Sequence, residues 1–376
     1  MEEGGIYIHI PFCRNKCLYC DFYSAGERIA DWDIFCKTVI SELKSRLKEI
    51  DFIPTTLYLG GGTPSLIPVE VFKRIISLLK SELGINEWKE FTIEVNPEDV
   101  CHEKCKVWRE MGVNRVSVGI QTLNDSELKI IGRKHSSEDA LKAFNLLHQY
   151  FDNISVDVMF GIPSQTPESY KTTLEKIIEF RPSHISSYSL MLEEGTAMTL
   201  LVKRGKLKLP QEDDWMKMFQ LTKEKLQDAG YIRYEISNFA LPGFESRHNT
   251  SYWLGKPYIG LGPGAHSFDG RNTRRANPND IKGYIRNFDT DSRIFYTEET
   301  LSTEERREEM IMTRLRMADG LNIEEFEAEF GEKEKNRLLQ NSKEYISRNL
   351  MKLIGKKLSF TDSGFEISDL ILSNLF

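Results

Sequence analysis

Short apolar runs alternate with longer amphipathic stretches over the first two thirds of the chain. Six of the short runs are rich in Val, Ile, Tyr and Ser and are bounded by Gly, Pro or Asn. They predict strands at 5–10, 55–60, 90–95, 114–120, 153–160 and 184–190. The stretches between them predict helices at 30–49, 68–82, 99–111, 137–150 and 167–180. Strands joined by helical crossovers form a parallel sheet, so the pattern predicts an α/β fold.

The placement of polar residues favours a barrel over a doubly wound sheet. Nearly every residue with functional character lies at the end of a predicted strand or just after it, as do Gly61, Glu94 and Gln121. Active sites of barrels gather at the carboxyl ends of their strands. We therefore expect a partial (β/α)6, TIM-like barrel with a ligand site at that end.

The pattern changes after about residue 211. A helix is predicted at 211–229, followed by a stretch rich in Gly and aromatic residues, and the charged segment 297–309 indicates a linker or the start of a helix. Short helices and a strand pair near 352–362 are typical of a small winged-helix-like domain. We therefore expect three parts: a barrel core at 1–235, an extension at 236–296 and a mainly helical C-terminal domain at 297–376.

Composition narrows the class of protein. The chain has 376 residues, 40% of them hydrophobic and 28% charged, and it lacks a run of about eighteen apolar residues. Its first residues lack the basic and apolar regions of a secretory signal, so we expect a cytoplasmic protein. The net charge of −7 repels a phosphate backbone, and the candidate recognition helix near 333–353 carries acids. Nucleic acid is therefore not an expected partner.

Three of the six cysteines, Cys13, Cys17 and Cys20, lie together in CRNKCLYC, directly after the first predicted strand. Six cysteines in a chain of this length do not form a disulfide framework, so the three thiols indicate a metal. Structural zinc requires four ligands, and His9 and Asp21 would complete only an irregular set. Three cysteines can instead hold three irons of a [4Fe–4S] cluster and leave the fourth open. The other cysteines lie in helix-like stretches and have no assigned role: Cys36, Cys101 and Cys105.

Further motifs follow the next strands. They are the glycines Gly60 to Gly62 with Thr63, then Glu94, Gln121, Arg133 and Asp157. Glycines let the backbone approach a ligand and offer N–H groups to a carboxylate, and a guanidinium pairs with one. Each residue alone is equally typical of a barrel rim or a helix cap. Their shared position after consecutive strands favours a single ligand site.

Cys-x3-Cys-x2-Cys preceded by YIHIPF is similar to the radical S-adenosylmethionine (SAM) signature. Together with GGGTPS, EVNPE, SVGIQTLND, IGRKH, DVMFGIPSQT and GLGPGAHS, it resembles the oxygen-independent coproporphyrinogen III oxidase (HemN) family over nearly the whole chain. The resemblance implies a [4Fe–4S] cluster held by the three clustered cysteines, SAM on the open iron, and an electron donor. The SAM contacts that it implies are Tyr7, Gly61, Gly62, Thr63, Glu94, Gln121, Arg133 and Asp157.

Two departures separate the chain from the oxidase. The oxidase has a further cysteine where Phe22 stands, and a long N-terminal extension where this chain starts its first strand within about five residues of Met1. Both departures resemble the heme-chaperone (HemW) branch of the family. A third motif, His248-Asn249-x-x-Tyr252-Trp253, resembles the HNRxYW signature of that branch, with Thr250 in place of the arginine.

This branch implies heme as bound cargo and hemoproteins as recipients, with membrane contact only through a recipient. His248 is the candidate heme ligand, and Tyr252 and Trp253 are candidate heme contacts. Packing or hydrogen bonding of His248 at the barrel rim is the other reading, and His135 and His266 are alternative ligands. Porphyrinogen oxidation, another radical reaction on a tetrapyrrole, and a zinc-stabilised adaptor remain alternative functions. No catalytic residue is assigned, and monomer and homodimer both stay open.

The segment GLGPGA, residues 260–265, is similar to the glycine-rich turn of dinucleotide-binding proteins. Pro263 and the lack of a predicted helix after it argue against that function. The segment resembles a family element at the inner barrel edge near SAM.

Overall fold

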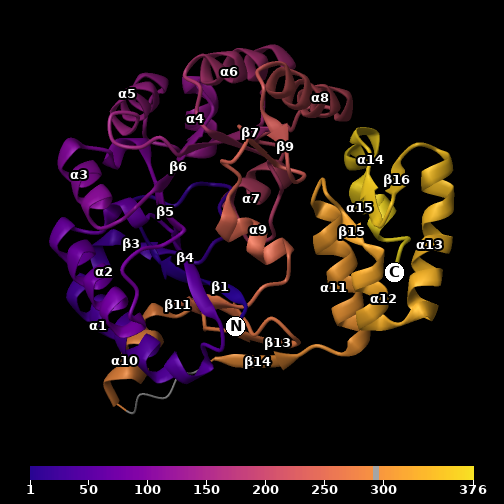
Figure 1. Ribbon diagram of the computed structural model, residues 1–376. Coiled ribbons are helices and arrows are strands. Elements are labelled where there is room, and N and C mark those ends of the chain that lie inside the picture. Colours follow the sequence, from indigo (N-terminus) through magenta and orange to yellow (C-terminus); the bar gives the residue numbers. More distant parts are fainter. Residues whose placement is uncertain (291–295) are drawn as a thin grey trace.

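The computed structural model, which describes residues 1–290 and 296–376, is built on a twelve-stranded sheet (Figure 1). Its centre is parallel, and the six predicted strands are confirmed as consecutive neighbours, joined on one side by an unpredicted seventh strand. In spatial order the parallel strands are β11 (Tyr258–Leu261), β1 (Glu3–Ile10), β4 (Ile53–Gly61), β5 (Glu90–Val95), β6 (Arg115–Gln121), β7 (Ile154–Phe160) and β8 (His184–Ser189).

Antiparallel strands extend both edges of the sheet. They are β12 (His266–Phe268), β13 (Thr273–Ala276) and β14 (Thr297–Thr300) beyond β11, and β10 (Asn238–Ala240) and β9 (Ile232–Arg233) beyond β8. The segment 297–309 was expected to be a linker or the start of a helix. Its first four residues instead form strand β14. Its TEET sequence is exposed and has no apolar alternation, and it pairs with β13 so that Glu299 faces Arg274 and Glu298 faces Arg275. Opposite charges across the two strands replace the missing hydrophobic pattern.

Amphipathic helices cover the convex face of the barrel (Figure 1). The predicted helices are confirmed to within a few residues as α1 (Trp32–Arg46), α2 (Val69–Leu83), α3 (His102–Glu110), α5 (Ser137–Leu147), α6 (Pro167–Glu179) and α8 (Glu212–Asp228). Other helices were not predicted, among them α4 (Asp125–Ile131), α7 (Ala197–Lys203) and α10 (Ile281–Thr290). The first two have seven residues each, too few for a helical period to emerge from the sequence.

Alternation along the strands separates an apolar face from a polar one. Residues such as Ile6, Ile8, Leu57, Leu59, Ile93 and Val118 are fully buried and form the core with the helices. The opposite, concave face carries polar side chains at matching heights, because parallel register aligns Tyr7 with Tyr58 and Glu94 with Ser117. The interior of this part-barrel is therefore a polar lumen.

Helix α9 (Arg247–Trp253) closes the lumen at the amino ends of the strands. The buried carboxylate of Glu90 accepts hydrogen bonds from the backbone N–H groups of Arg247 and His248, at 2.6 and 3.1 Å, and from the hydroxyl of Ser246. A carboxylate is favourable at a helix N-terminus, where backbone N–H groups lack partners. The guanidinium of Arg115 is also buried, and among the charges around it the carboxylate of Glu90 does most to raise its pKa and so to stabilise its charged form.

The C-terminal domain packs beside the barrel (Figure 1). It contains α11 (Thr303–Arg316), α12 (Ile323–Phe330), α13 (Glu332–Ser347), α14 (Asp362–Glu366), α15 (Ser368–Leu372) and an antiparallel sheet of β15 (Leu321–Asn322), β17 (Lys357–Phe360) and β16 (Met351–Ile354). The predicted helices and strand pair are confirmed. Arg316 joins the domain to the barrel, because its Nε donates to Oε2 of the buried Glu235 at 2.8 Å. Among the described helices, none is long and apolar enough to cross a membrane.

Replacing Glu90 tests how strongly α9 is fixed. Glu90→Ala removes the acceptor of four donors, the three in α9 and its cap and the hydroxyl of Thr92, and leaves Arg115 without its main counter-charge. We expect the free energy of unfolding to fall by about 3 kcal/mol or more, measured by chemical denaturation. The matched control is Glu87→Ala, whose side chain is exposed and whose effect should stay within about 0.5 kcal/mol. Equal stability of both variants would contradict the anchoring role.

Candidate functional site

The three clustered cysteines lie in the loop that follows β1, and all three are partly buried. The short strands β2 (Phe12–Cys13) and β3 (Ala25–Gly26) pair at the base of this loop. Its middle is held by backbone hydrogen bonds, from Leu18 N–H to the carbonyl of Ile131 and from Met198 N–H to the carbonyl of Leu18. The two unpredicted helices α4 and α7 therefore fix the position of the cysteine loop.

The thiols lie near enough to influence one another electrostatically. Burial raises the pKa of Cys13, and the neighbouring Cys17 adds to the rise. Burial likewise raises the pKa of Cys20, with Cys17 and Cys13 contributing. Thiolates in such a place require a strong positive partner, which the irons of a cluster supply. This donor set fits a [4Fe–4S] cluster.

Within the described part of the chain, no group of three or more His, Cys, Asp or Glu side chains is arranged around one metal ion. That finding concerns a single ion. A [4Fe–4S] cluster instead places each cysteine on a different iron.

The glycines at the end of β4 bring this strand against the cysteine loop. A Cβ on Gly62 would lie 2.7 Å from the carbonyl oxygen of Ile10 and 2.8 Å from that of Phe12, closer than packed atoms approach. A Cβ on Gly61, whose φ is +105°, would strike the ring of His9 at 2.4 Å. Both positions therefore require glycine for packing, and they leave the backbone exposed to a ligand above it.

A chain of polar contacts leads from the cysteines into the lumen. The hydroxyl of Thr63 donates to Sγ of Cys13 at 3.4 Å and accepts from Nδ2 of Asn96 at 3.5 Å. Arg133 donates through Nη1 to Oδ1 of Asn96 at 2.7 Å and through Nη2 to the carbonyl of Gly119 at 3.0 Å. Its Nε is buried and has no hydrogen-bond partner among the described residues. An anionic group would satisfy that donor.

Glu94, the fifth residue of β5, places an acidic group near the carboxyl end of that strand. Its carboxylate accepts hydrogen bonds from the hydroxyl of Tyr58 at 2.7 Å and from Gly61 N–H at 3.2 Å. Burial, together with the nearby Asp157, nevertheless raises the pKa of Glu94 to about 7. A carboxyl group poised in this way is suited to bind a cationic amine, which would favour its ionised form.

The remaining predicted SAM contacts lie around this pair. Asp157 accepts from the hydroxyl of Ser117 at 3.2 Å, and burial raises the pKa of its carboxyl group. Gln121 ends β6 with a φ of +68°, which is rare for a residue with a side chain, and it follows a break in strand register. Tyr7 is hydrogen-bonded to Nδ1 of His9 at 3.0 Å. Gln121 lies at the carboxyl end of its strand, whereas Tyr7 and Asp157 lie near the middle of β1 and β7 and face the lumen below it.

Together, the orphaned Nε of Arg133 and the poised carboxyl group of Glu94 fit a ligand with one carboxylate and one ammonium group. The amino-acid part of SAM carries both. The polar lumen beside the cysteine loop is thus chemically matched to SAM as well as to a cluster.

The HNxxYW motif lies at the opposite end of the barrel. His248 is 0% exposed, and its two ring nitrogens are hydrogen-bonded to the hydroxyls of Thr56 and Tyr252, each at 2.7 Å. Its ring also stacks on Tyr58, with centroids 5.1 Å apart, and burial lowers its pKa to about 3. In this arrangement neither nitrogen is available to a heme iron.

The two alternative histidines differ in exposure. His135 is buried beneath the end of β6, where Nε2 is hydrogen-bonded to the carbonyl of Ile120 at 3.3 Å. His266, at the start of β12, is exposed. Phe22, at the position that distinguishes the chain from the oxidase, is 65% exposed at the edge of the cysteine loop.

Sequence reasoning missed several residues that support the site. Asn96 connects Thr63 to Arg133, and Glu90 with Arg115 fixes the closed end of the barrel. The strand period could have found Asn96, because it stands two positions after Glu94. Glu90 and Arg115 are charged residues at the first positions of otherwise apolar strands, which is a signal for a buried polar cluster.

Comparison with known proteins agrees with this geometry. The family model of the radical SAM superfamily matches residues 7–177, and that of the HemN C-terminal domain matches residues 301–367. Coproporphyrinogen III oxidase (HemN) from Escherichia coli has the same fold, with a TM-score of 0.84 over all of this chain and 90% of that one, at 22% sequence identity. The fold is therefore that of a radical SAM protein of the HemN type.

Curated relatives narrow this class. The heme chaperone HemW of Lactococcus lactis is 35% identical over 98% of this chain and 96% of its own length. HemW of Bacillus subtilis is 34% identical over 86% of both chains, and the mitochondrial radical S-adenosyl methionine domain-containing protein 1 of Danio rerio is 32% identical over 86% of this chain and 75% of its own. The chain belongs to the HemW family of heme chaperones. Membership in the radical SAM superfamily implies a [4Fe–4S] cluster and SAM.

Removing one cluster cysteine tests the metal site. After anaerobic reconstitution, Cys17→Ala should lose the visible cluster absorbance and most of its iron and acid-labile sulfide, because one iron has lost its ligand. The matched control is Cys101→Ala, whose thiol is exposed at the start of α3 and should not be needed. Retention of a full cluster in Cys17→Ala would refute the assignment.

Glu94 should make SAM binding depend on pH. Below its pKa of about 7 the carboxyl group is protonated, so an ammonium group must displace a proton to bind. We expect SAM affinity of the reconstituted protein to rise between about pH 6 and pH 7 by up to about tenfold, and then to level off. Calorimetric titration of Glu94→Gln should lose this rise, whereas Glu87→Gln should keep it. An identical pH profile in Glu94→Gln would exclude Glu94 as the group responsible.

Proposed function

We propose that this protein binds heme and transfers it to hemoproteins, using a [4Fe–4S] cluster and SAM at the carboxyl ends of the barrel strands. The observation that carries the proposal is the similarity to HemW of Lactococcus lactis, a protein named a heme chaperone, over 98% of this chain. The HNxxYW motif in α9 and the exposed Phe22 in the cysteine loop support the same function.

Cys13, Cys17 and Cys20 would hold the cluster, which supplies an electron to SAM when both are bound. The chain itself orients the cofactor. Glu94 would bind the amino group of SAM and Arg133 its carboxylate, while the close-packed glycines of β4 form the floor of the site. Tyr7, Thr63, Gln121 and Asp157 complete the proposed SAM contacts.

Tyr252 and Trp253 are the proposed heme contacts in the motif. For His248 to ligate heme iron, its ring would first exchange the hydrogen bonds to Thr56 and Tyr252 for the metal. The proposed partners are recipient hemoproteins and an electron donor, in the cytoplasm.

A second candidate function is oxidation of coproporphyrinogen III, which the shared fold with HemN favours. At 22% identity that similarity shows the fold alone. The two functions make opposite predictions in one anaerobic assay with SAM, a reductant and coproporphyrinogen III. Formation of protoporphyrinogen would establish the oxidase, and its absence together with stable heme binding would favour the chaperone.

The direct test is titration of the reconstituted protein with hemin. We expect a shifted Soret band that saturates at a fixed ratio of heme to protein, followed by loss of the band when an apo-hemoprotein is added. Apo-protein without the cluster is the matched control for the role of the cofactor, and metal analysis should find iron rather than zinc. No change in the Soret region would remove the chaperone function.

A further inference from the structure

We propose that an apolar cavity between α9 and the C-terminal domain binds one edge of the heme, an inference that rests on the proposed function above. The cavity has a volume of about 320 Å³, within the range of small-molecule sites. Residues from both parts of the chain line it: Ile236, Trp253, Met312, Phe360, Phe365 and Phe376. Trp253 is the last residue of α9, so the cavity includes the end of the HNxxYW motif.

The walls of the cavity are aromatic and apolar. Phe360 and Phe365 are buried, and their rings meet edge to face with centroids 5.5 Å apart, which fixes one wall. Trp253 and Ile236 add an indole ring and an aliphatic side chain to the lining. A flat, apolar ligand stacks favourably on such rings.

Two polar features make the cavity selective. Nε1 of Trp253 is buried and has no hydrogen-bond partner among the described residues, so it remains able to donate to a ligand. The guanidinium of Arg316 lies 4.5 Å from the centroid of the Trp253 ring, and among the described residues its one hydrogen-bond partner is Glu235, which it reaches through Nε. The side chain of Arg316 is 34% exposed, so its outer nitrogens can reach a carboxylate at the mouth of the cavity.

These features match a metalloporphyrin, which is an apolar plate with carboxylate groups at one edge. Asp369 also lines the cavity and would repel a carboxylate. A propionate would therefore bind next to Arg316. A porphyrin is larger than the cavity, and its centre would therefore lie at the mouth. Met312 lines the cavity and is 49% exposed, so its thioether, a ligand that heme iron accepts, is accessible to a bound heme.

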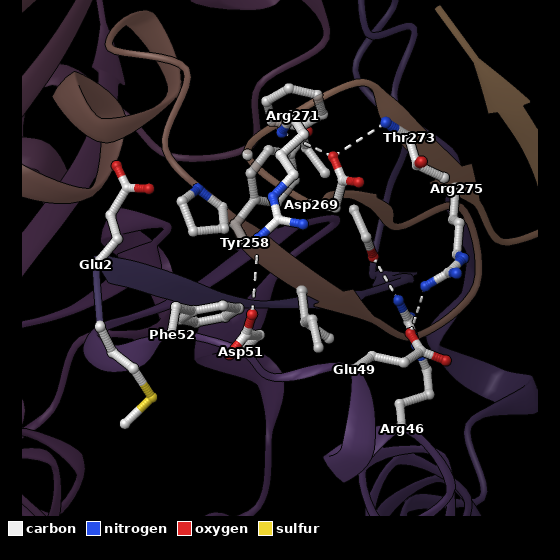
Figure 2. Close-up of a pocket in the computed structure, with 16 residues that line it drawn as sticks. Glu2, Arg46, Glu49, Asp51, Phe52, Tyr258, Asp269, Arg271, Thr273 and Arg275 are labelled. Carbon is white, nitrogen blue, oxygen red and sulfur yellow. Dashed lines mark hydrogen bonds and ion pairs between the residues drawn. The ribbon is translucent and has the colours of Figure 1, made fainter.

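A second cavity of about 350 Å³, next to β11 and β12, lacks these properties (Figure 2). It holds several arginines, but their charges are already matched. Arg46 and Arg275 both contact the carboxylate of Glu49, and Arg271 lies 3.8 Å from that of Asp51. Its lining therefore offers less attraction to a carboxylate than the cavity at Trp253.

The two halves of α9 thus have different roles. The N-terminal half of α9 enters the barrel and is fixed there through His248, whereas the C-terminal half presents Trp253 to the cavity. The heme would bind at Trp253 and Met312 without displacing His248 from its hydrogen bonds.

The experiment is titration of the full-length, reconstituted protein with hemin, comparing two variants with wild type. Trp253→Ala removes the stacking surface and should weaken heme binding by about tenfold or more. Met312→Leu keeps the apolar volume but removes the sulfur, and it should shift the Soret maximum of the complex. The matched control is Met191→Leu, a methionine that is 68% exposed in the loop after β8 and should leave both affinity and spectrum unchanged.

A second readout does not depend on the stability of the alanine variant. Heme quenches the fluorescence of a nearby indole, so Trp253→Phe, which keeps a ring at this position, should lose a large share of the quenching seen in wild type. Affinity in that variant should stay within a few-fold of wild type.

The outcomes separate this inference from the proposed function. Wild-type affinity and spectrum in both Trp253→Ala and Met312→Leu would overturn the cavity while leaving heme binding intact. A shift in the monomer–dimer equilibrium of Trp253→Ala with unchanged heme affinity would also overturn it, because the cavity would then bind a second copy of the chain. No Soret change in wild type would remove the proposed function and this inference together.

Discussion

The structure depends on finding hydrogen-bond partners for the polar side chains that line the lumen of a part-barrel. The convex faces of the strands are apolar and pack against helices, whereas the concave faces carry Tyr, Ser, Glu, Asp and Arg side chains. Buried polar groups without partners are costly, so the lumen has to be filled or closed. The fold meets this constraint differently at its two ends.

At the amino ends of the strands, the buried carboxylate and imidazole groups of the lumen find their hydrogen-bond partners within the protein. Glu90 accepts from the start of α9, and the two buried imidazoles His184 and His248 each use both ring nitrogens. Burial lowers the pKa of both histidines, with the positive Arg115 contributing, so that they are neutral near pH 7. At the carboxyl ends, in contrast, Arg133 keeps an unused donor and Glu94 a pKa of about 7. At one end the Glu90 carboxylate and the two imidazoles are paired within the protein, whereas at the other Arg133 and Glu94 are organised for a ligand.

Long periodic segments made the barrel predictable, and short or exposed ones did not. The six strands and their covering helices follow from hydrophobic alternation sustained over many residues. Helices α4, α7 and α9 have seven residues each, and β14 is exposed along its whole length, so no local pattern announces them. These unpredicted elements nevertheless position the cysteine loop and close the barrel.

The candidate site shows the same division. The residues near the carboxyl ends of the strands were predictable because motifs that follow consecutive parallel strands converge in space. The burial of His248 was not, since the same motif letters suit either an exposed ligand or a packed ring. Only the three-dimensional partners Thr56, Tyr58 and Tyr252 decide between them in this conformation. Trp253 acquires its surroundings from the C-terminal domain, more than fifty residues further along the chain.

The location of α9 has a consequence for how its side chains communicate with the ligand site. His248 stacks on Tyr58, and the hydroxyl of Tyr58 donates to Glu94 at 2.7 Å. One tyrosine therefore lies between the helix that carries the motif and the carboxyl group proposed to bind the amino group of SAM. A change in the hydrogen bonds of His248 would reach that carboxyl group through the ring of Tyr58.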